Sequence, residues 1–320
     1  MSALVEVRGL TKHFMPSALW ILTGAEMIKA VEDVSFKIDE GTTYGLVGES
    51  GCGKTTAGRL ILRLIELTSG KVFFEGKDVT EFSTQELHEY RRKAQIIFQN
   101  PFSSLNPRRS MLDILSTGYK VYNLGTKKER REWLETLIER VGLDPRHLDR
   151  YPHQFSGGQR QRLVIARALT LNPKFIVADE PVSALDKSIQ AQILNLLRDL
   201  KGELGFTMLL ISHDLRLIYH MSDHVGVMYM GKLVESASSF DLYANPLHPY
   251  TQALITSAPS IDPDQEMPQG LLEGELWSKE PPKDGCIFYH RCRQAVPECE
   301  HRPQELVDRG DGHLVACWRA

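Results

Sequence analysis

The sequence predicts an α/β fold, in which short buried strands alternate with amphipathic helices. Three apolar runs have the length and composition of strands in a parallel sheet that is covered on both faces: residues 43–47, 174–179 and 207–212. Between them, two segments repeat apolar residues at helical spacing. The first face carries Trp133, Leu134, Leu137, Ile138 and Val141, and the second carries Ile189, Ile193, Leu196, Leu197 and Leu200. This alternation runs from Leu4 to about Pro259 and is typical of one α/β domain.

Composition and charge exclude several classes of protein. The chain has 320 residues, 42% of them hydrophobic, so it can bury a sizeable core without disulfides. A net charge of −3 argues against a nucleic-acid binder that depends on electrostatics, because such proteins are usually strongly basic. No apolar run approaches the roughly 20 residues that span a bilayer, and the first residues do not resemble a secretory signal. We therefore expect a cytoplasmic protein.

The composition changes after Pro259, where prolines and glycines interrupt a stretch without clear periodicity. We expect a linker there, followed by a small appendage, together residues 260–320. Four of the five cysteines lie in this appendage: Cys286, Cys292, Cys299 and Cys317. In a reducing compartment such clustering favours a metal over disulfides. Four thiolates suit either a tetrahedral Zn²⁺ or an iron–sulfur cluster, although the closely spaced cysteine pairs of zinc sites are missing.

A phosphate-binding pattern stands between the strand at 43–47 and a helix expected from Thr55 to about Leu67. Its residues are Gly48, Glu49, Ser50, Gly51, Cys52, Gly53, Lys54 and Thr55, and they match G-x-x-x-x-G-K-[ST]. The glycines let backbone N–H groups surround a phosphate, and the positive end of the following helix adds to the attraction. We expect Lys54 to reach the β- and γ-phosphates and the Thr55 hydroxyl to bind Mg²⁺, with Thr56 also near the nucleotide.

Two carboxylates end the apolar strand at residues 174–179. A carboxylate at the carboxyl end of a parallel strand faces the ligand crevice of such a sheet. Asp179 is expected to hold Mg²⁺ through water, and Glu180 to polarise the water that attacks the γ-phosphate.

Four further signatures follow in a characteristic order along the chain: Gln99 after a strand-like segment, Ser156-Gly157-Gly158-Gln159 before a helix, Ser183-Ala-Leu-Asp186 after the acidic strand, and His213 after Leu-Leu-Ile-Ser. With the glycine loop and the acidic strand, they resemble the ATPase subunit of an ABC transporter, and the resemblance covers essentially the whole chain. It implies a P-loop domain over residues 1–259 with a parallel-sheet core, an antiparallel β subdomain and a helical subdomain inserted at about 101–168.

The resemblance also assigns roles to these residues. Gln99 is expected to contact Mg²⁺ and the attacking water, and His213 the γ-phosphate in its own site. The segment from Ser156 to Gln159 would bind the ATP held by the opposite subunit, with Asp186 at the interface of the dimer. For adenine stacking we expect Phe14, with Trp20 as the alternative.

Finer features resemble the oligopeptide/dipeptide importer subfamily, closest to its F-type ATPase subunit. They are Gly-Glu-Ser-Gly-Cys-Gly-Lys, the segment 98–107, Asn245-Pro-Leu-His-Pro-Tyr-Thr-Gln-Ala-Leu254 and the cysteine tail. The resemblance implies a second, related ATPase subunit, two membrane permease subunits at the cytoplasmic face of the membrane, and an external solute-binding protein. A homodimer is also possible. Phe102 and Leu105 are candidate contacts to a permease.

The solute is expected to be a dipeptide or oligopeptide, with oligosaccharides or nickel as alternatives within the subfamily. A soluble ABC ATPase without a transport role and an exporter are more distant alternatives. In some members of the subfamily the cysteine tail holds a [4Fe–4S] cluster, so we expect a cluster there before zinc.

Overall fold

The computed structural model describes residues 2–15, 27–257, 276 and 281–320. The chain divides into two compact units, unit 1 (Met1–Glu81 with Leu210–Ala320) and unit 2 (Phe82–Leu209), and strand β8 (Thr207–Ser212) crosses the division. The boundary expected at residue 259 lies outside the described residues, so the division into 1–259 and 260–320 stays a prediction.

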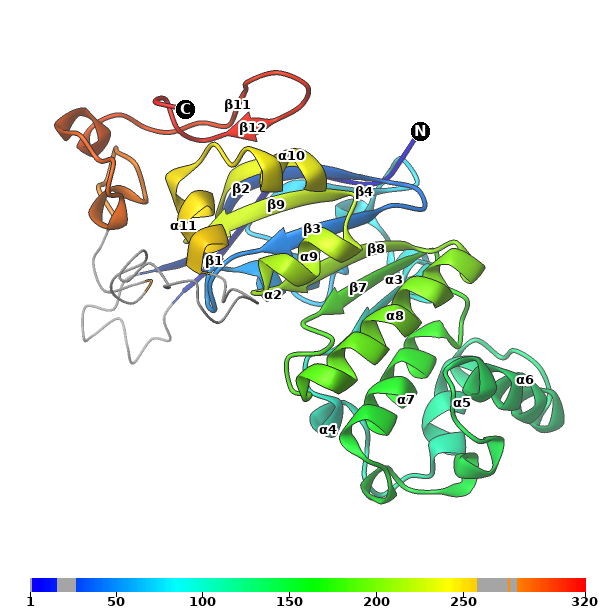
Figure 1. The fold of residues 1–320 in the computed structure, drawn as a ribbon. Helices are drawn as coiled ribbons and strands as arrows, with labels where there is room; N and C mark the ends of the chain where they lie inside the picture. Colours follow the sequence, from blue (N-terminus) through cyan, green and yellow to red (C-terminus); the bar gives the residue numbers. More distant parts are fainter. Residues whose placement is uncertain (1, 16–26, 258–275, 277–280) are drawn as a thin grey trace. The chain divides into compact units, whose positions relative to one another are not determined.

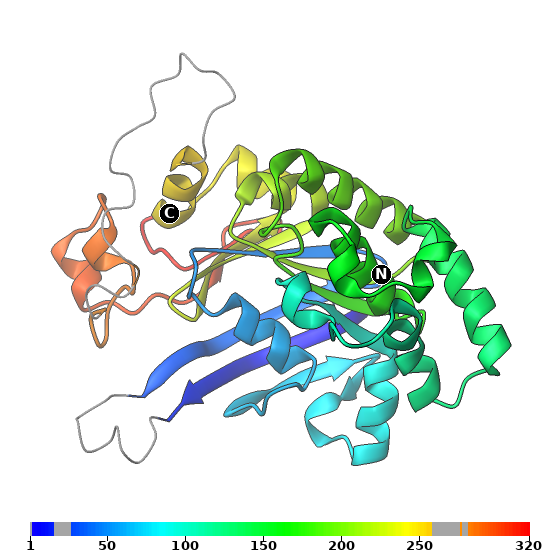
Figure 2. The same cartoon turned by 90° about the horizontal axis from the view of Figure 1, so that it is seen from below.

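Unit 1 contains a four-stranded antiparallel sheet in the order β2-β1-β4-β5. Its strands are β1 (Ala3–Phe14), β2 (Ile28–Asp39), β4 (Ser69–Phe74) and β5 (Lys77–Asp78). Figure 2 shows β1 and β2 as the long pair drawn in blue. Side chains such as Val5 and Leu10 are fully buried, whereas Arg8 is exposed, as expected for strands with one face in the core.

The second sheet of unit 1 includes the strands β11-β12-β10-β9-β3 in that order. They are β3 (Thr43–Val47), β9 (His224–Tyr229), β10 (Lys232–Ser238), β11 (Val307–Asp308) and β12 (Leu314–Val315). Strand β3 is parallel to β9 and buried along its whole length, which confirms the buried strand predicted at 43–47. Helix α9 (Leu215–Met221) lies against β3 (Figure 1), and α10 (Ser239–Ala244) and α11 (Pro249–Ser257) follow β10.

Helix α2 (Lys54–Ile61) follows β3, as predicted, but it is shorter than expected. The prediction that it continues to about Leu67 is wrong. Arg63 has a φ of 49°, a left-handed conformation that ends an α-helix. Its guanidinium donates hydrogen bonds to the carbonyls of Val79 and Thr80 in the short helix η1 (Val79–Glu81), at 3.0 and 2.6 Å, and these bonds help to hold the turn.

Unit 2 combines helices with a parallel pair of strands. The strands are β6 (Ala94–Ile97) and β7 (Phe175–Asp179), and β7 confirms the strand predicted at 174–179. The helices are α3 (Thr84–Lys93), α4 (Pro101–Ser104), α5 (Met111–Val121), α6 (Lys127–Arg140), η2 (Pro145–Asp149), η3 (Pro152–Gln154), α7 (Gly157–Leu169) and α8 (Lys187–Leu204). Capping boxes begin α3, α6 and α7, and Gly205 in a left-handed conformation ends α8.

The predicted helix faces are confirmed at their centres and differ at their margins. Leu137 and Ile138 of α6 and Leu197 of α8 are buried. Trp133 is 43% exposed, because its ring packs edge-on against Tyr119 at a centroid distance of 5.3 Å and does not enter the core.

Of the two candidate permease contacts, Leu105 is only 2% exposed, which indicates ordinary packing within unit 2. The side chain of Phe102 lies outside the described residues. Among the helices in the described ranges, none has both the length and the apolar character that a bilayer crossing requires.

Candidate functional site

The phosphate-binding pattern forms the turn between β3 and α2 in unit 1, where only glycine fits at two positions. A Cβ atom on Gly48 would lie 2.2 Å from the carbonyl oxygen of Met228. At Gly53, where φ is 109°, it would lie 2.1 Å from the carbonyl oxygen of Ala30. Neighbouring backbone, which cannot move aside cheaply, therefore confines the chain to this turn.

The first turn of α2 is suited to an anion. It contains no acidic residue, and its N-cap, Gly53, offers no side chain to the helix N–H groups. Lys54 is only 5% exposed, and its ammonium donates to the carbonyl oxygens of Gly48 (2.7 Å) and Glu49 (2.8 Å). The lysine thus lies within the loop, as the sequence predicts.

The other residues of the loop differ in exposure. Ser50 and Gly51 are exposed, whereas Thr55 and Thr56 at the start of α2 are half-buried. Cys52 is completely buried, and burial raises the pKa of its thiol, which disfavours a reactive thiolate.

In unit 2, Asp179 ends strand β7 and Glu180 directly follows it. Asp179 is 2% exposed. Glu180 has a φ of 45°, an uncommon conformation for a residue with a side chain, and such strain concentrates at functional sites. The amide of Gln99, which follows β6, donates to the Glu180 carboxylate at 2.7 Å. The structure therefore brings together the expected water-polarising carboxylate and the expected magnesium-contacting amide.

The segment Ser156–Gln159 begins α7 in unit 2. The Ser156 hydroxyl accepts a hydrogen bond from the N–H of Gln159 at 3.4 Å, and the Gln159 side chain accepts one from the N–H of Ser156 at 3.1 Å. Gly157 is half-buried, and a Cβ on Gly158 would lie 2.8 Å from Cγ2 of Ile189 in α8. The segment therefore caps the N-terminus of α7.

Two further predicted residues lie at ends of strands or helices. His213 is exposed and follows β8, just before Asp214, whose carboxylate caps α9 through the N–H groups of Arg216 and Leu217. Asp186 is the N-cap of α8 but makes no side-chain capping bond, so capping does not account for its carboxylate.

The adenine-stacking candidate Phe14 ends β1 and is 41% exposed, with the Lys12 ammonium 5.1 Å from the centre of its ring. Its alternative, Trp20, lies outside the described residues.

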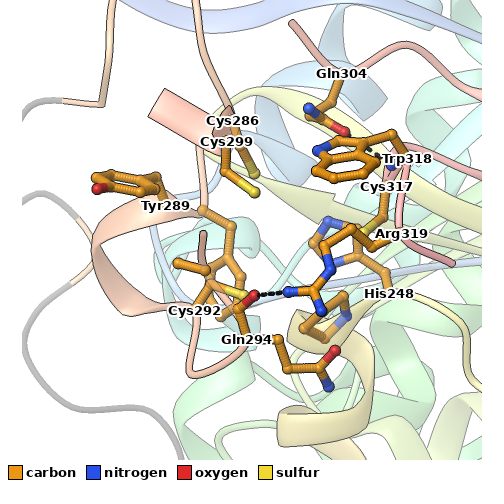
Figure 3. A pocket seen from close by; sticks show the side chains of 13 residues that line it. His248, Cys286, Tyr289, Cys292, Gln294, Cys299, Gln304, Cys317, Trp318 and Arg319 are labelled. Atoms are coloured by element: carbon orange, nitrogen blue, oxygen red, sulfur yellow. Dashed lines mark hydrogen bonds between the residues drawn. The ribbon is translucent and has the colours of Figure 1, made fainter. Parts of the chain in front are cut away.

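The four cysteines predicted to act together line one pocket of unit 1 (Figure 3). Cys286 precedes the short helix η4 (Tyr289–Arg291), Cys292 follows it, Cys299 lies in η5 (Pro297–Glu300), and Cys317 comes after β12. His248, Trp318 and Arg319 are among the other residues of its wall, and Arg319 donates to the backbone carbonyl of Gln294.

This pocket is small and apolar around its thiols. Its cavity volume of about 20 Å³ is room for about one water molecule. Burial, with smaller contributions from the neighbouring cysteines, raises the pKa of the Cys286 thiol to about 11. No group of three or more His, Cys, Asp or Glu side chains in the described ranges is arranged to hold a metal ion. The donor set suits a metal, but the present geometry does not suit a single bound ion.

Two residues at the phosphate-binding loop could not be found by motif. Tyr250 and Arg291 both contact Glu49: the Tyr250 hydroxyl accepts its N–H, and the Arg291 guanidinium pairs with its carboxylate. The only signal was that both stand in segments typical of the subfamily, namely 245–254 and the cysteine tail.

Comparison with known proteins agrees with these motifs. A family model described as "ABC transporter" matches residues 31–183, and one described as "Oligopeptide/dipeptide transporter, C-terminal region" matches residues 234–299. The oligopeptide transport ATP-binding protein AppF of Bacillus subtilis is 47% identical over 98% of this chain and 96% of its own. A Brucella ovis protein with the provisional name of peptide import ATP-binding protein BOV_A0347 is 50% identical over 99% of this chain and 98% of its own.

A solved structure shares the fold. The ATP-binding cassette MJ0796, solved as a dimer with ADP and Pi bound, aligns with a TM-score of 0.65 and 29% identity over 73% of this chain and 98% of its own. The loop, the acidic strand end and these relatives together show that the chain belongs to the family of ABC transporter ATP-binding subunits and carries an ABC ATPase domain.

Proposed function

We propose that this subunit binds ATP on the loop from Gly48 to Thr55 and uses its hydrolysis to drive the import of dipeptides or oligopeptides. The observation that carries ATP binding is the loop itself, in which two glycines that tolerate no side chain place Lys54 beside an uncapped helix N-terminus. Peptide as the solute is supported by the names of relatives that match nearly the whole chain and by the matched C-terminal region.

The residues of each unit have distinct proposed tasks. In unit 1, Lys54 neutralises the β- and γ-phosphates, backbone N–H groups from Ser50 to Thr56 surround them, and His213 contacts the γ-phosphate. Phe14 supplies a face for the adenine. In unit 2, Glu180 polarises the attacking water and Gln99 orients it.

A magnesium ion bound with ATP would neutralise charge that develops on the phosphates. Thr55, Asp179 and Gln99 carry the oxygen ligands that Mg²⁺ prefers, and we propose that they hold it.

We further propose that the subunit works as a dimer. The segment Ser156–Gln159 would bind the ATP of the opposite subunit, with Asp186 at the interface, because one chain does not need two anion-binding helix N-termini for one nucleotide. The neighbouring structure MJ0796 is dimeric. The second ATPase subunit is proposed to be a related, distinct chain, with a homodimer as the alternative.

The remaining partners follow from the transport role. Two permease subunits would hold the protein at the cytoplasmic face of the membrane, and an external binding protein would deliver the solute to them. Nucleic acid is not among the proposed partners. The proposed organisation is an ATPase domain over 1–259, with its helical subdomain at about 101–168, and an extension over 260–320.

We also propose that Cys286, Cys292, Cys299 and Cys317 hold a [4Fe–4S] cluster in preference to Zn²⁺. The support is that all four thiols line one apolar pocket in a segment that has little core of its own. The cavity would have to widen around such a group. Bound there, a cluster would tie the four segments together.

Iron content tests this part. Protein purified without oxygen should contain about four iron atoms per chain and absorb visible light, and replacing Cys292 with Ser should remove both signals. Colourless protein with no iron would end the cluster proposal, and one zinc per chain would replace it with a zinc site.

The function is tested in the transporter reconstituted with its permeases and binding protein. Peptides should stimulate ATP hydrolysis, whereas oligosaccharides and nickel should not. Stimulation by a sugar or by nickel alone would contradict the proposed solute. Failure of the purified subunit to bind MgATP would contradict the function as a whole.

The role of Glu180 has a sharper test. Glu180→Gln keeps the size of the side chain and can still contact Gln99, but it removes the carboxylate that acts as the base. MgATP should therefore still bind, while hydrolysis falls by about two to four orders of magnitude. Turnover at the unmodified rate would show that another group polarises the water.

A further inference from the structure

A partly buried ion pair links the cysteine-bearing extension to the phosphate-binding loop. Arg291, in η4, faces Glu49 of the loop with both ends of its guanidinium: Nη1 lies 3.0 Å from Oε1 and Nη2 lies 3.1 Å from Oε2. The arginine side chain is only 8% exposed and that of the glutamate 25% exposed. Paired, parallel bonds of this kind fix orientation as well as charge, and a lysine cannot reproduce them.

A second contact fixes the backbone of the same loop residue. The Tyr250 hydroxyl accepts the N–H of Glu49 at 3.0 Å, and Tyr250 is completely buried. Residues far along the chain therefore hold both the side chain and the main chain of Glu49.

Arg291 is itself held in place. Its guanidinium carbon lies 5.8 Å from the centre of the Tyr229 ring, and its backbone N–H donates to Phe288 at 3.0 Å. Phe288 packs edge-on against Tyr229 and Tyr250, with ring centres 5.2 and 5.4 Å apart. Arg291 directly precedes Cys292, which lines the four-cysteine pocket, while the side chain of Arg291 itself reaches the loop.

Glu49 connects this support to the lysine that meets phosphate. Its carbonyl oxygen accepts the Lys54 ammonium at 2.8 Å and the N–H of Cys52 at 3.3 Å. A shift of Glu49 would move an acceptor of Lys54 and the start of the turn that precedes the helix. If this ion pair served only stability, it would not need to involve Glu49, the residue whose carbonyl oxygen accepts the Lys54 ammonium.

We propose that Arg291 is a positioning residue for the nucleotide phosphates: by holding Glu49 it keeps the loop in its binding conformation, so that the extension sets the affinity for ATP. The proposal rests on the function proposed above. It predicts weaker ATP binding when the pair is broken, because a loop already held in its bound conformation loses less conformational freedom when ATP binds. It predicts little effect on the rate of the chemical step once ATP is bound.

The experiment compares single and double substitutions. Arg291→Met and Glu49→Gln should each weaken MgATP binding to the purified full chain roughly tenfold, within the usual range for coupling between sites. In the assembled transporter KM should rise with kcat nearly unchanged. The double variant should bind no more weakly than the weaker single variant, because both remove the same interaction.

Two further variants separate positioning from general stability. Arg291→Lys keeps the charge but only part of the geometry, so it should bind MgATP with intermediate affinity. Arg302→Met is the matched control: the guanidinium carbon of this extension arginine lies 4.7 Å from the centre of the Trp318 ring, its contacts in the described part of the chain do not include the loop, and its loss should leave ATP affinity unchanged.

Wild-type affinity in Arg291→Met, or additive losses in the double variant, would overturn the proposal. If Arg291→Met does not fold, Glu49→Gln and Arg291→Lys decide in its place. A wild-type chain that fails to bind MgATP would instead overturn the proposed function, so the two failures are distinguishable.

Discussion

The molecule carries two glycine-containing helix N-termini that are built in opposite ways. At the start of α2, Gly53 is the N-cap, its φ is 109°, and it has no side chain with which to cap the helix. At the start of α7, Ser156 caps the helix through a complete capping box with Gln159. The first helix end depends on surrounding backbone for its shape, and the second depends on its own side chains.

The difference extends to what an added methyl group would meet. At Gly53 it would strike a backbone carbonyl at 2.1 Å, whereas at Gly157 it would lie 3.5 Å from a leucine side chain, an ordinary contact. Folding alone therefore explains the glycine at Gly53 but not at Gly157. A glycine that the fold does not require indicates that something else must approach the chain there.

The largest effect is expected from Gly53→Ala. The clash with Ala30 and the left-handed backbone should destabilise the protein by about 3 kcal/mol or more and abolish ATP binding. Thermal unfolding and nucleotide titration would measure this. A variant that kept both properties would remove the contrast between the two helix ends.

A middle-sized effect is expected from Ser156→Ala. Losing the capping hydroxyl should cost about 1 kcal/mol of unfolding free energy, measurable by urea denaturation. Ser156→Asp, which can also cap, should restore most of the stability. If the alanine variant has the free energy of unfolding of the wild type, the hydrogen bond to Gln159 does not stabilise the start of α7.

The smallest effect on stability is expected from Gly157→Ala, at most about 0.5–1 kcal/mol and in the stabilising direction. ATP binding by the isolated subunit should be unchanged, because its loop is untouched. Hydrolysis by the assembled transporter should fall at least tenfold if an opposite nucleotide must approach this backbone. Full hydrolysis would mean that Gly157 faces no nucleotide.

Local patterns were enough to predict three buried strands and the loop. An apolar run of five residues, a glycine pattern and a helix signal are all contiguous in sequence, and β3, the loop and the start of α2 follow from them. The sequence likewise places Glu180 at the end of an apolar strand, although only the structure shows its contact with Gln99.

Features set by distant parts of the chain could not be predicted. Helix α2 ends early because Arg63 turns toward carbonyls of residues 79 and 80, a contact that no periodicity encodes. Trp133 fits a helical stripe yet remains partly exposed against Tyr119. The support of Glu49 by Arg291 depends on a pairing across 242 residues, and although Arg291 stands in a segment typical of the subfamily, neither sequence shows that the two residues meet.

That long separation has a consequence for synthesis. Chains emerge from the ribosome N-terminus first, so the strand, glycine loop and helix that receive phosphate are made long before their partner arginine, 242 residues later. A nascent chain can form the turn but cannot complete its ion pair. If Arg291 positions Glu49 as proposed above, unfinished chains bind ATP with low affinity. Full affinity for ATP is reached only when the extension has been translated and folded. The extension would then delay ATP hydrolysis until the extension itself has been made and folded.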